Sequence, residues 1–233
     1  MIVVLLAAGK GKRTGKVGEK KQKSSFLLEQ NLSVLNKYFD KIFIIVGHRK
    51  EDIINMVAKS KKVKEKITII EQKELLGNAN AISLTEGYIK EPFIVANGDI
   101  LLKKDYFDKL LKCNPPALAV SPVNDPWNYG VVTLKNGYVT DIVEKPAKGK
   151  EGKKHGNLII SGIYYFTPYI FEAIAKTQLN EKRKEYNLTD SMLLLLKQRK
   201  IETALIEKPK HIITEKDIIK ILKNVRHNRL CRE

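Results

Sequence analysis

The start of the chain joins an apolar run to a glycine-rich, basic stretch that could bind phosphate groups. Residues 2–6 are all apolar and include β-branched residues, which predicts a strand buried on both faces. Ala8, Gly9 and Gly11 follow, and such small residues let backbone N–H groups approach a ligand closely. Arg13 adds positive charge at the same place, together with neighbouring lysines. A strand that runs into a loop of this kind predicts a phosphate site.

Two common nucleotide-binding motifs do not fit this loop. A dinucleotide-binding loop needs Gly-x-Gly-x-x-Gly and an acidic residue after the next strand. Here Thr14 occupies the third glycine position, and Gly47-His48-Arg49 follows the second predicted strand. The Walker spacing, Gly-x-x-x-x-Gly-Lys, is absent as well. A plain glycine turn between a strand and a helix is the remaining alternative, and it gives Arg13 no role.

Two later positions could bind a base and a metal ion. Gln72 follows the third predicted strand, and its amide can both donate and accept hydrogen bonds, as the edge of a pyrimidine requires. Gly77 would let the backbone approach that base. Asp99 ends the fourth predicted strand, where its carboxylate could hold Mg²⁺ between phosphates. The alternatives are an exposed polar residue at Gln72 and a turn cap at Asp99.

The elements that must position these residues alternate between strand and helix. Apolar runs predict strands at 41–46, 67–70, 92–100, 117–121 and 201–206; helical spacing covers 26–39, 51–58 and the very apolar 188–196. Residues 14–25 lack apolar periodicity and are expected to be flexible. Asn136-Gly137 predicts a hairpin between 129–134 and 138–144, and a strand follows at 157–166. Thr214 should cap a last helix at 215–225. This alternation predicts an α/β fold with a mainly parallel sheet, whose ligands gather at the carboxyl ends of the strands.

Composition limits the function classes. The chain has 233 residues, enough for one large domain, and 43% of them are hydrophobic. No apolar run approaches the roughly 18 residues of a membrane helix, so no membrane partner is expected. The two cysteines predict reduced thiols in a cytoplasmic protein. The sequence starts with the apolar run and shows no basic lead or cleavage site, so export is not expected. The net charge of +17 suits an anionic substrate, whereas the lysine clusters lack the interleaved aromatic residues that nucleic-acid binding favours.

Several motifs together resemble one enzyme family. Leu6-Ala7-Ala8-Gly9-x-Gly11-x-Arg13 resembles the signature loop of the sugar-1-phosphate nucleotidylyltransferases. This family includes glucose-1-phosphate thymidylyl- and uridylyltransferases and the N-terminal domain of N-acetylglucosamine-1-phosphate uridylyltransferase. The later landmarks arrive in the family's order: Gln72 with Gly77, Gly98-Asp99, Tyr129-Gly130, Glu144-Lys145-Pro146, Ser161-Gly162, and the segment from Glu185 to Asp190.

The resemblance implies a Rossmann-like three-layer αβα sandwich with a mainly parallel mixed sheet and an inserted antiparallel sugar-binding hairpin. It also implies a single domain over residues 1–233, with a nucleotide-binding half at 1–122 and a sugar-phosphate half at 123–233. The implied reaction joins a sugar 1-phosphate to a nucleoside triphosphate, UTP, dTTP or CTP, with Mg²⁺ as cofactor. The oligomeric state stays open, a homo-oligomer included.

Carried over by residue, the resemblance implies a catalytic set and a binding set. Arg13 and Lys23 would act on the leaving pyrophosphate, Asp99 on the metal, and Lys145 on the incoming phosphate. The implied binding residues are Leu6, Ala8, Gly9, Gly11 and Lys20 on the triphosphate, Gln72 and Gly77 on the base, and Gly130, Glu144, Ser161, Gly162 and Thr189 around the sugar.

The sequence departs from the family at three places. The Pro-Lys that normally follows the signature Arg is missing, so Lys23 is preferred and Lys20 is second. Asn78 stands where Thr is usual, which leaves the base preference open. His211 occupies the position of the second metal-binding Asp, and imidazole is a poor ligand for Mg²⁺. Either Asp99 holds the metal with phosphates and water, or activity is reduced.

Three other functions remain as alternatives; the third, a nucleic-acid binder, would be revealed by salt-dependent affinity for duplex or single-stranded nucleic acid. The first is a cytidylyltransferase for phosphocholine or inositol phosphate, for which Trp127, Tyr129 and Tyr164 could offer aromatic faces to a quaternary ammonium group. The second is a catalytically weak nucleotide-sugar-binding subunit, for which His211 is the motive. Pyrophosphate formation with a panel of acceptors would separate them.

Overall fold

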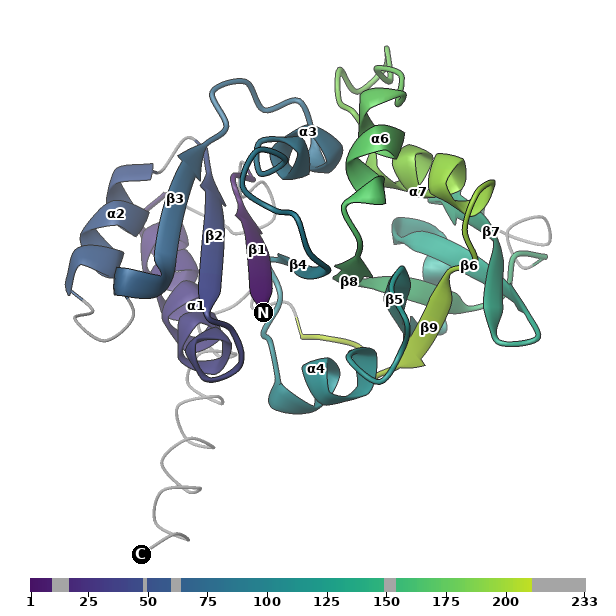
Figure 1. Cartoon of the computed structure of the whole chain (residues 1–233), viewed down its shortest axis with the longest axis horizontal. Helices are drawn as coiled ribbons and strands as arrows, with labels where there is room; N and C mark the ends of the chain where they lie inside the picture. Colours follow the sequence, from purple (N-terminus) through teal and green to yellow (C-terminus); the bar gives the residue numbers. More distant parts are fainter. Residues whose placement is uncertain (10–16, 48–49, 60–63, 149–153, 211–233) are drawn as a thin grey trace, which may run out of the picture.

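One mixed sheet runs through the described part of the chain. The structure is a computed structural model that describes residues 1–9, 17–47, 50–59, 64–148 and 154–210. Within these residues, nine strands follow the order β3-β2-β1-β4-β8-β5-β9-β7-β6 (Figure 1). They are β1 (Ile2–Ala7), β2 (Lys41–Val46), β3 (Ile67–Glu71), β4 (Phe93–Asn97), β5 (Ala117–Pro122), β6 (Gly130–Lys135), β7 (Tyr138–Glu144), β8 (Leu158–Phe166) and β9 (Glu202–Leu205).

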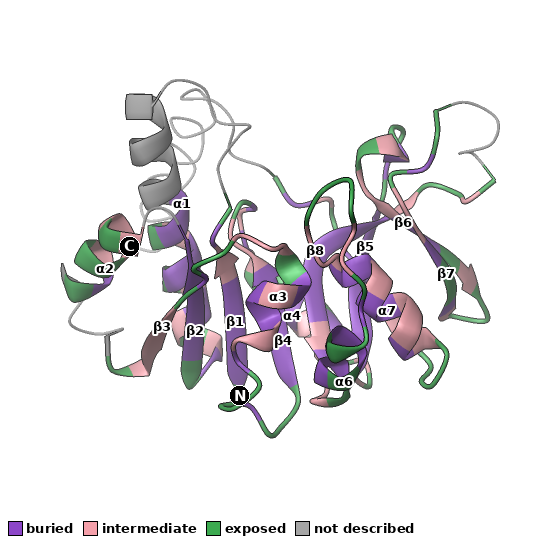
Figure 2. Cartoon of the chain, turned by 90° about the horizontal axis from the view of Figure 1, so that it is seen from above, coloured by how far each residue is buried: buried purple, intermediate pink, exposed green. Residues whose placement is uncertain are grey.

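The first four strands form a parallel sheet covered on both faces. β1 pairs in parallel with β2 and β4, and β2 pairs with β3. β1, β2 and β4 are almost entirely buried (Figure 2), as expected for apolar strands between two helix layers. One cluster of buried side chains joins the sheet to α1 (Val17–Tyr38), α2 (Lys50–Lys59) and α4 (Lys104–Leu110). The other joins it to α3 (Asn78–Ser83), α6 (Tyr169–Ala175) and α7 (Leu188–Leu196). The predicted three-layer αβα fold is confirmed.

The second half of the sheet is largely antiparallel and closes on itself. β8 runs antiparallel to both β4 and β5, and β5 pairs in parallel with β9. β9 contacts β7, β7 pairs with β6, and β6 returns to β8. The pairings therefore form a ring of β8, β5, β9, β7 and β6, beside the open parallel part. Asn136 and Gly137 join β6 to β7 with φ of 53° and 80°, the positive values that a tight hairpin turn requires, so the predicted hairpin is confirmed.

One predicted segment is wrong. Residues 14–25 were expected to be flexible, but α1 begins at Val17. Residues 17–25 contain Glu, Gln and several Lys, which have good helix propensity without an apolar stripe, so periodicity did not reveal them. The short 3₁₀ turns η1 (Lys64–Lys66) and η2 (Pro126–Asn128) complete the described elements, and the last predicted helix, 215–225, lies outside them. Within the described residues, no helix has the length and apolar character needed to cross a membrane.

Candidate functional site

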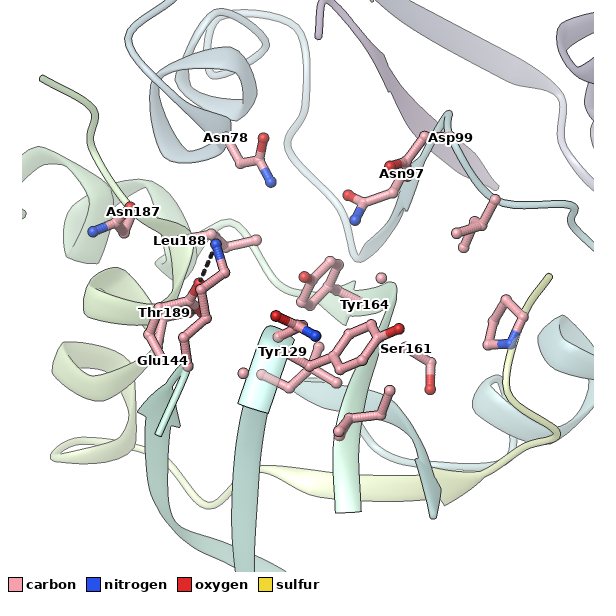
Figure 3. Close-up of a pocket in the computed structure, with 18 of the residues that line it drawn as sticks. Asn78, Asn97, Asp99, Tyr129, Glu144, Ser161, Tyr164, Asn187, Leu188 and Thr189 are labelled. Atoms are coloured by element: carbon pink, nitrogen blue, oxygen red, sulfur yellow. Dashed lines mark hydrogen bonds and ion pairs between the residues drawn. The ribbon is translucent and has the colours of Figure 1, made fainter. Parts of the chain in front are cut away.

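A cavity of about 290 Å³ lies between the end of β4 and the ring of strands (Figure 3). β4, β7 and β8 and the start of α7 each contribute residues to its wall. The position agrees with the rule that ligands of such sheets bind near strand ends. The predicted residues that line this cavity are Asp99, Gly130, Glu144, Lys145, Ser161, Gly162 and Thr189. The structure therefore brings together residues that are up to 90 positions apart in the sequence, and their roles stay predictions.

The loop after β4 carries Asp99 and is attached directly to β1. The Gly98 N–H donates to the Leu6 carbonyl oxygen, with an N···O distance of 2.9 Å. A Cβ at position 98 would lie 2.7 Å from that same oxygen, so a residue with a side chain could not approach so closely. Glycine here lets the chain turn beside β1 and presents the exposed Asp99 carboxylate at the cavity.

Asn31 of α1 holds the same loop from the other side. Its Nδ2 donates to the Ile100 carbonyl oxygen at 2.8 Å, and its Oδ1 accepts from the Leu102 N–H at 2.9 Å. Asn31 is completely buried, so these bonds replace water for two backbone groups. The Leu101 N–H donates to the Lys210 carbonyl oxygen at 2.9 Å. The residues that follow Asp99 are thus fixed by α1 and by the segment after β9.

Glu144 is the centre of a polar cluster at the opposite wall. Its Oε2 accepts from the Thr189 hydroxyl at 3.1 Å. Its Oε1 lies 3.5 Å from Arg183 Nη1 and 3.6 Å from Lys145 Nζ. Both cations are exposed, so each ion pair contributes little to stability, and the cluster is available to a ligand. A carboxylate in this position can accept hydrogen bonds from hydroxyl groups, and the two cations can bind a phosphate.

The residue after Glu144 has an uncommon backbone conformation. Lys145 adopts a φ of 51°, in the left-handed region that residues other than glycine rarely adopt. Its N–H donates to the Tyr129 carbonyl oxygen at 3.0 Å. Gly130 lies opposite Glu144 in the β6–β7 register, and a Cβ at Gly130 would lie 3.3 Å from Glu144 Oε2. The hairpin thus holds Glu144 and Lys145 at the rim in one geometry.

Asn97 and Tyr164 line the cavity between these two walls. The Asn97 side chain packs on Gly162, where a Cβ would lie 2.7 Å from Asn97 Nδ2. The Tyr164 ring is 7% exposed, and burial raises the pKa of its hydroxyl, with the negative charges of Glu144 and Asp99 adding to the effect. Tyr164 is therefore a neutral hydrogen-bonding group at physiological pH.

The segment before α7 links the two halves of the molecule across the cavity. The Tyr186 N–H donates to the Leu76 carbonyl oxygen at 2.7 Å, and the Tyr186 carbonyl oxygen accepts from the Ala79 N–H at 3.2 Å. Gly77, between these partners, has a φ of 94°, and a Cβ there would lie 2.7 Å from the Tyr186 oxygen. Gly77 thus has a packing role beside its predicted binding role.

Gln72 lies in a second cavity, of about 350 Å³, near the ends of β2 and β3. Its Nε2 donates to the Gly77 carbonyl oxygen at 3.0 Å and to Asn80 Oδ1 at 2.8 Å. Because a backbone carbonyl can only accept, these contacts fix the orientation of the amide. Both amide protons have protein partners, so Gln72 has only its carbonyl oxygen to offer a base. Of the predicted donor and acceptor roles, only the acceptor role is left in this arrangement.

The predicted triphosphate loop is only partly described. The Leu6 carbonyl oxygen is already paired with Gly98, Ala8 is buried beside Gly47, and Gly9 is exposed, with open space where a side chain would be. The other predicted residues of this loop and its linker lie outside the described structure, Gly11 and Arg13 entirely and Lys20 and Lys23 in their side chains. His211, at the predicted second metal position, lies outside it as well.

One described carboxylate beside the cavity, that of Asp99, could serve as a metal ligand. Among them, no group of three or more His, Cys, Asp and Glu side chains is arranged to hold a metal. Asp99 offers one hard oxygen ligand beside the cavity, and Mg²⁺ in phosphate-transfer sites needs one or two carboxylates together with phosphates and water.

Four cavity or loop residues were missed by the sequence reasoning. Asn97 could have been found, because it directly precedes Gly98-Asp99 at the strand end. Lys208 and Arg183 lie in segments that carry many charged residues, so nothing marked them out. Asn31 is a polar residue in the middle of an apolar helical pattern, and that exception was the available signal.

Comparisons with known proteins show which family the chain belongs to. Residues 2–211 match the nucleotidyl transferase family. The chain is 34% identical over 209 residues to the bifunctional protein GlmU of Methanocaldococcus jannaschii, covering 87% of this chain and 48% of that protein. It is 31% identical over 214 residues to the UTP–glucose-1-phosphate uridylyltransferase AglF of Haloferax volcanii, covering 84% of each. The chain thus spans about half the length of the GlmU proteins it matches.

Solved structures share the fold at lower sequence identity. The inositol-1-phosphate CTP transferase of T. maritima superposes with a TM-score of 0.71 at 19% identity, covering 93% of this chain and 90% of that one. A UDP-glucose pyrophosphorylase complexed with UDP-glucose gives a TM-score of 0.66 at 23% identity, covering 90% and 91%. From the match over residues 2–211, the two relatives and the shared fold, it follows that this chain belongs to the nucleotidyl transferase family.

Proposed function

We propose that the protein is a Mg²⁺-dependent nucleotidylyltransferase that joins a sugar 1-phosphate to a nucleoside triphosphate. The observation that carries this proposal is the single cavity that Asp99, Glu144, Lys145 and Thr189 share. It offers acceptors for sugar hydroxyls at one wall and a metal-binding carboxylate at the other. The relative AglF, named as a UTP–glucose-1-phosphate uridylyltransferase, supports the same reaction.

In the proposed reaction, a phosphate oxygen of the sugar 1-phosphate attacks the α-phosphorus of the triphosphate. The new P–O bond forms as the bond to the bridging oxygen breaks, and that electron pair leaves with pyrophosphate. The attacking oxygen is already ionised, so no general base is needed. Because both reactants are anions, the protein's task is to position them and to offset their charge.

The chain's residues divide this task. Lys145 and Arg183 neutralise the acceptor phosphate, while Glu144 and Thr189 hold the sugar. Arg13 and Lys23, with Lys20 as the second lysine, would act on the leaving pyrophosphate, as the family resemblance implies. Asp99 would hold Mg²⁺, which supplies positive charge to the phosphates. We place the reaction in the cytoplasm, and UTP, dTTP and CTP are the candidate triphosphates.

A pyrophosphate assay tests this proposal. The protein, Mg²⁺ and each triphosphate are mixed with a panel of sugar 1-phosphates, inositol phosphate and phosphocholine. We expect pyrophosphate with one triphosphate and a sugar 1-phosphate, and its loss in Asp99→Asn. Binding of nucleotide-sugars without any turnover would contradict an enzyme and support the binding subunit.

One contact disfavours phosphocholine as the acceptor. Lys208 Nζ already lies over the Tyr129 ring, 4.7 Å from its centroid. A cation on that face competes with a quaternary ammonium group for the same site. Trp127 is not among the residues that line the cavity. Of the three aromatic candidates, only Tyr164 thus offers an unoccupied face at the cavity, and a sugar 1-phosphate fits the described residues better than phosphocholine does.

A further inference from the structure

Asn97 lies where the two halves of the sheet meet. Its strand, β4, pairs in parallel with β1, where Leu6 is the register partner of Asn97, and antiparallel with β8. On the β8 side, Gly162 has a φ of 77° and no side chain, and Asn97 Nδ2 occupies the space a Cβ would need, 2.7 Å away. Figure 3 shows the Asn97 amide pointing into the region between Asn78 and Tyr164.

The polar character of Asn97 has no structural explanation in the described part of the chain. Its Oδ1 is buried, and no described residue donates a hydrogen bond to it. A buried carbonyl oxygen without a partner reduces stability, and such exceptions in native proteins call for a reason. An apolar side chain at the end of this buried strand would avoid that cost. The amide is explained if a ligand accepts a hydrogen bond from its Nδ2, at the cost of leaving Oδ1 without a donor.

We propose that Asn97 Nδ2 donates a hydrogen bond to a non-bridging oxygen of the α-phosphate. This inference rests on the proposed function and adds a substrate-contacting residue to it. β1, beside Asn97, leads into the predicted triphosphate loop, and Gly162, on the other side, lines the acceptor cavity. The phosphate that the acceptor attacks must lie between these two sites, which is the position of Asn97.

A neutral amide suits this position. Two anions meet here, and Asp99 already adds a negative charge two residues further on. As the acceptor oxygen bonds to the α-phosphorus and the bond to pyrophosphate breaks, charge is spread over the non-bridging oxygens. A donor held in place beforehand stabilises that charge without a proton transfer, so Asn97 keeps its protons throughout.

Three variants test the proposal. Asn97→Leu removes the donor at similar volume, and Asn97→Asp keeps the shape but replaces the donor with a negative oxygen. Asn36→Leu is the matched control, because Asn36 in α1 also has a buried Oδ1 without a partner among the described residues and is not among those that line the cavity. Pyrophosphate release, melting temperature and calorimetric binding of UTP, dTTP, CTP and glucose 1-phosphate are measured for each.

We expect Asn97→Leu to lower kcat by about 100- to 1,000-fold, as loss of one preorganised donor does elsewhere. Its affinity for the preferred triphosphate should fall by at least about tenfold, with glucose 1-phosphate binding unchanged. Asn97→Asp should be impaired at least as much, and Asn36→Leu should behave like the wild type.

Other results would overturn the proposal. Wild-type kcat and triphosphate affinity in Asn97→Leu would do so, as would an Asn97→Asp variant as active as the wild type, since only shape would then matter. A loss confined to glucose 1-phosphate binding would place Asn97 on the acceptor instead. If the wild type releases no pyrophosphate with any pair, the proposed function fails, and triphosphate affinity alone then decides the role of Asn97.

Discussion

Replacing Asn31 should release the loop that carries Asp99. In Asn31→Leu, the Ile100 carbonyl and the Leu102 N–H both lose their partner in a completely buried environment. Each unsatisfied backbone group costs about 1–3 kcal/mol, so the free energy of unfolding should fall by roughly 2–6 kcal/mol. Asn31→Asp should keep the bond from Leu102, but it places a carboxylate against the Ile100 carbonyl and should also be destabilised.

Hydrogen exchange distinguishes a local effect from a general one. The Leu102 amide should exchange much faster in Asn31→Leu than in the wild type under native conditions, because its acceptor is gone. Leu35→Ala is the control: Leu35 is one helical turn further along α1 and 0% exposed. Its loss should cost about 2–5 kcal/mol without breaking a bond to the loop. Urea titration of both variants provides the matching global stabilities.

The same variant should change catalysis through the metal. If Asn31 positions Asp99, Asn31→Leu should lower kcat and raise the Mg²⁺ concentration needed for half-maximal activity, with the KM of the acceptor unchanged. Leu35→Ala should leave the Mg²⁺ requirement as in the wild type. Equal Leu102 exchange in wild type and Asn31→Leu, or the same Mg²⁺ shift in Leu35→Ala, would refute this reasoning.

Three further predictions concern the cavity. Glu144→Gln replaces a charged acceptor with a neutral one and should raise the KM of the sugar 1-phosphate by about tenfold. The KM of the triphosphate should stay unchanged in the same steady-state kinetics. An equal rise in both KM values would contradict the place of Glu144 at the sugar. In Gly162→Ala, the new residue must adopt a positive φ and its Cβ must displace Asn97, so the free energy of unfolding should fall by about 1–2 kcal/mol and the melting temperature by roughly 2–8 °C. Gly87→Ala is the control, because the space around Gly87 is open, and it should melt like the wild type. Burial raises the pKa of Tyr164 in the folded state. Its contribution to stability is therefore complete below the ordinary tyrosine pKa of about 10 and is lost as pH rises through the folded value. Urea titrations above about pH 10 should show the free energy of unfolding falling more steeply in wild type than in Tyr164→Phe, and parallel curves would exclude this effect.

The strands were predictable because buried strands appear in this sequence as continuous apolar runs. β1, β2 and β4 are apolar runs that the helix layers bury on both faces. Asn136-Gly137 predicted the hairpin because these two residue types readily adopt the positive φ that its turn requires. The start of α1 was not predictable by the same means, because residues 17–25 form a helix without an apolar stripe. The closure of the strands into a ring depends on pairings between distant segments, such as Tyr138 with Glu202, which no local pattern encodes.

The candidate site was predictable where a motif named the residue and not where geometry alone created the contact. Glu144, Lys145 and Thr189 are far apart in sequence, yet the family resemblance placed them together, and they line one cavity. Arg183 reaches Glu144 from a turn whose sequence has no distinguishing pattern. Asn31 acts through backbone groups of another segment, so its role becomes visible only once the helix and the loop are placed side by side.

The paired hydrogen bonds of Tyr186 limit how ligands can be exchanged. The two halves are joined through the β4–β8 pairing at the sheet and again through Tyr186 to Leu76 and Ala79 on the other side of the cavity. A hinge at the β4–β8 pairing that swung the halves apart would have to break the Tyr186 hydrogen bonds. Product release should therefore proceed with the framework rigid, and its rate should depend on side chains at the rim rather than on domain rotation.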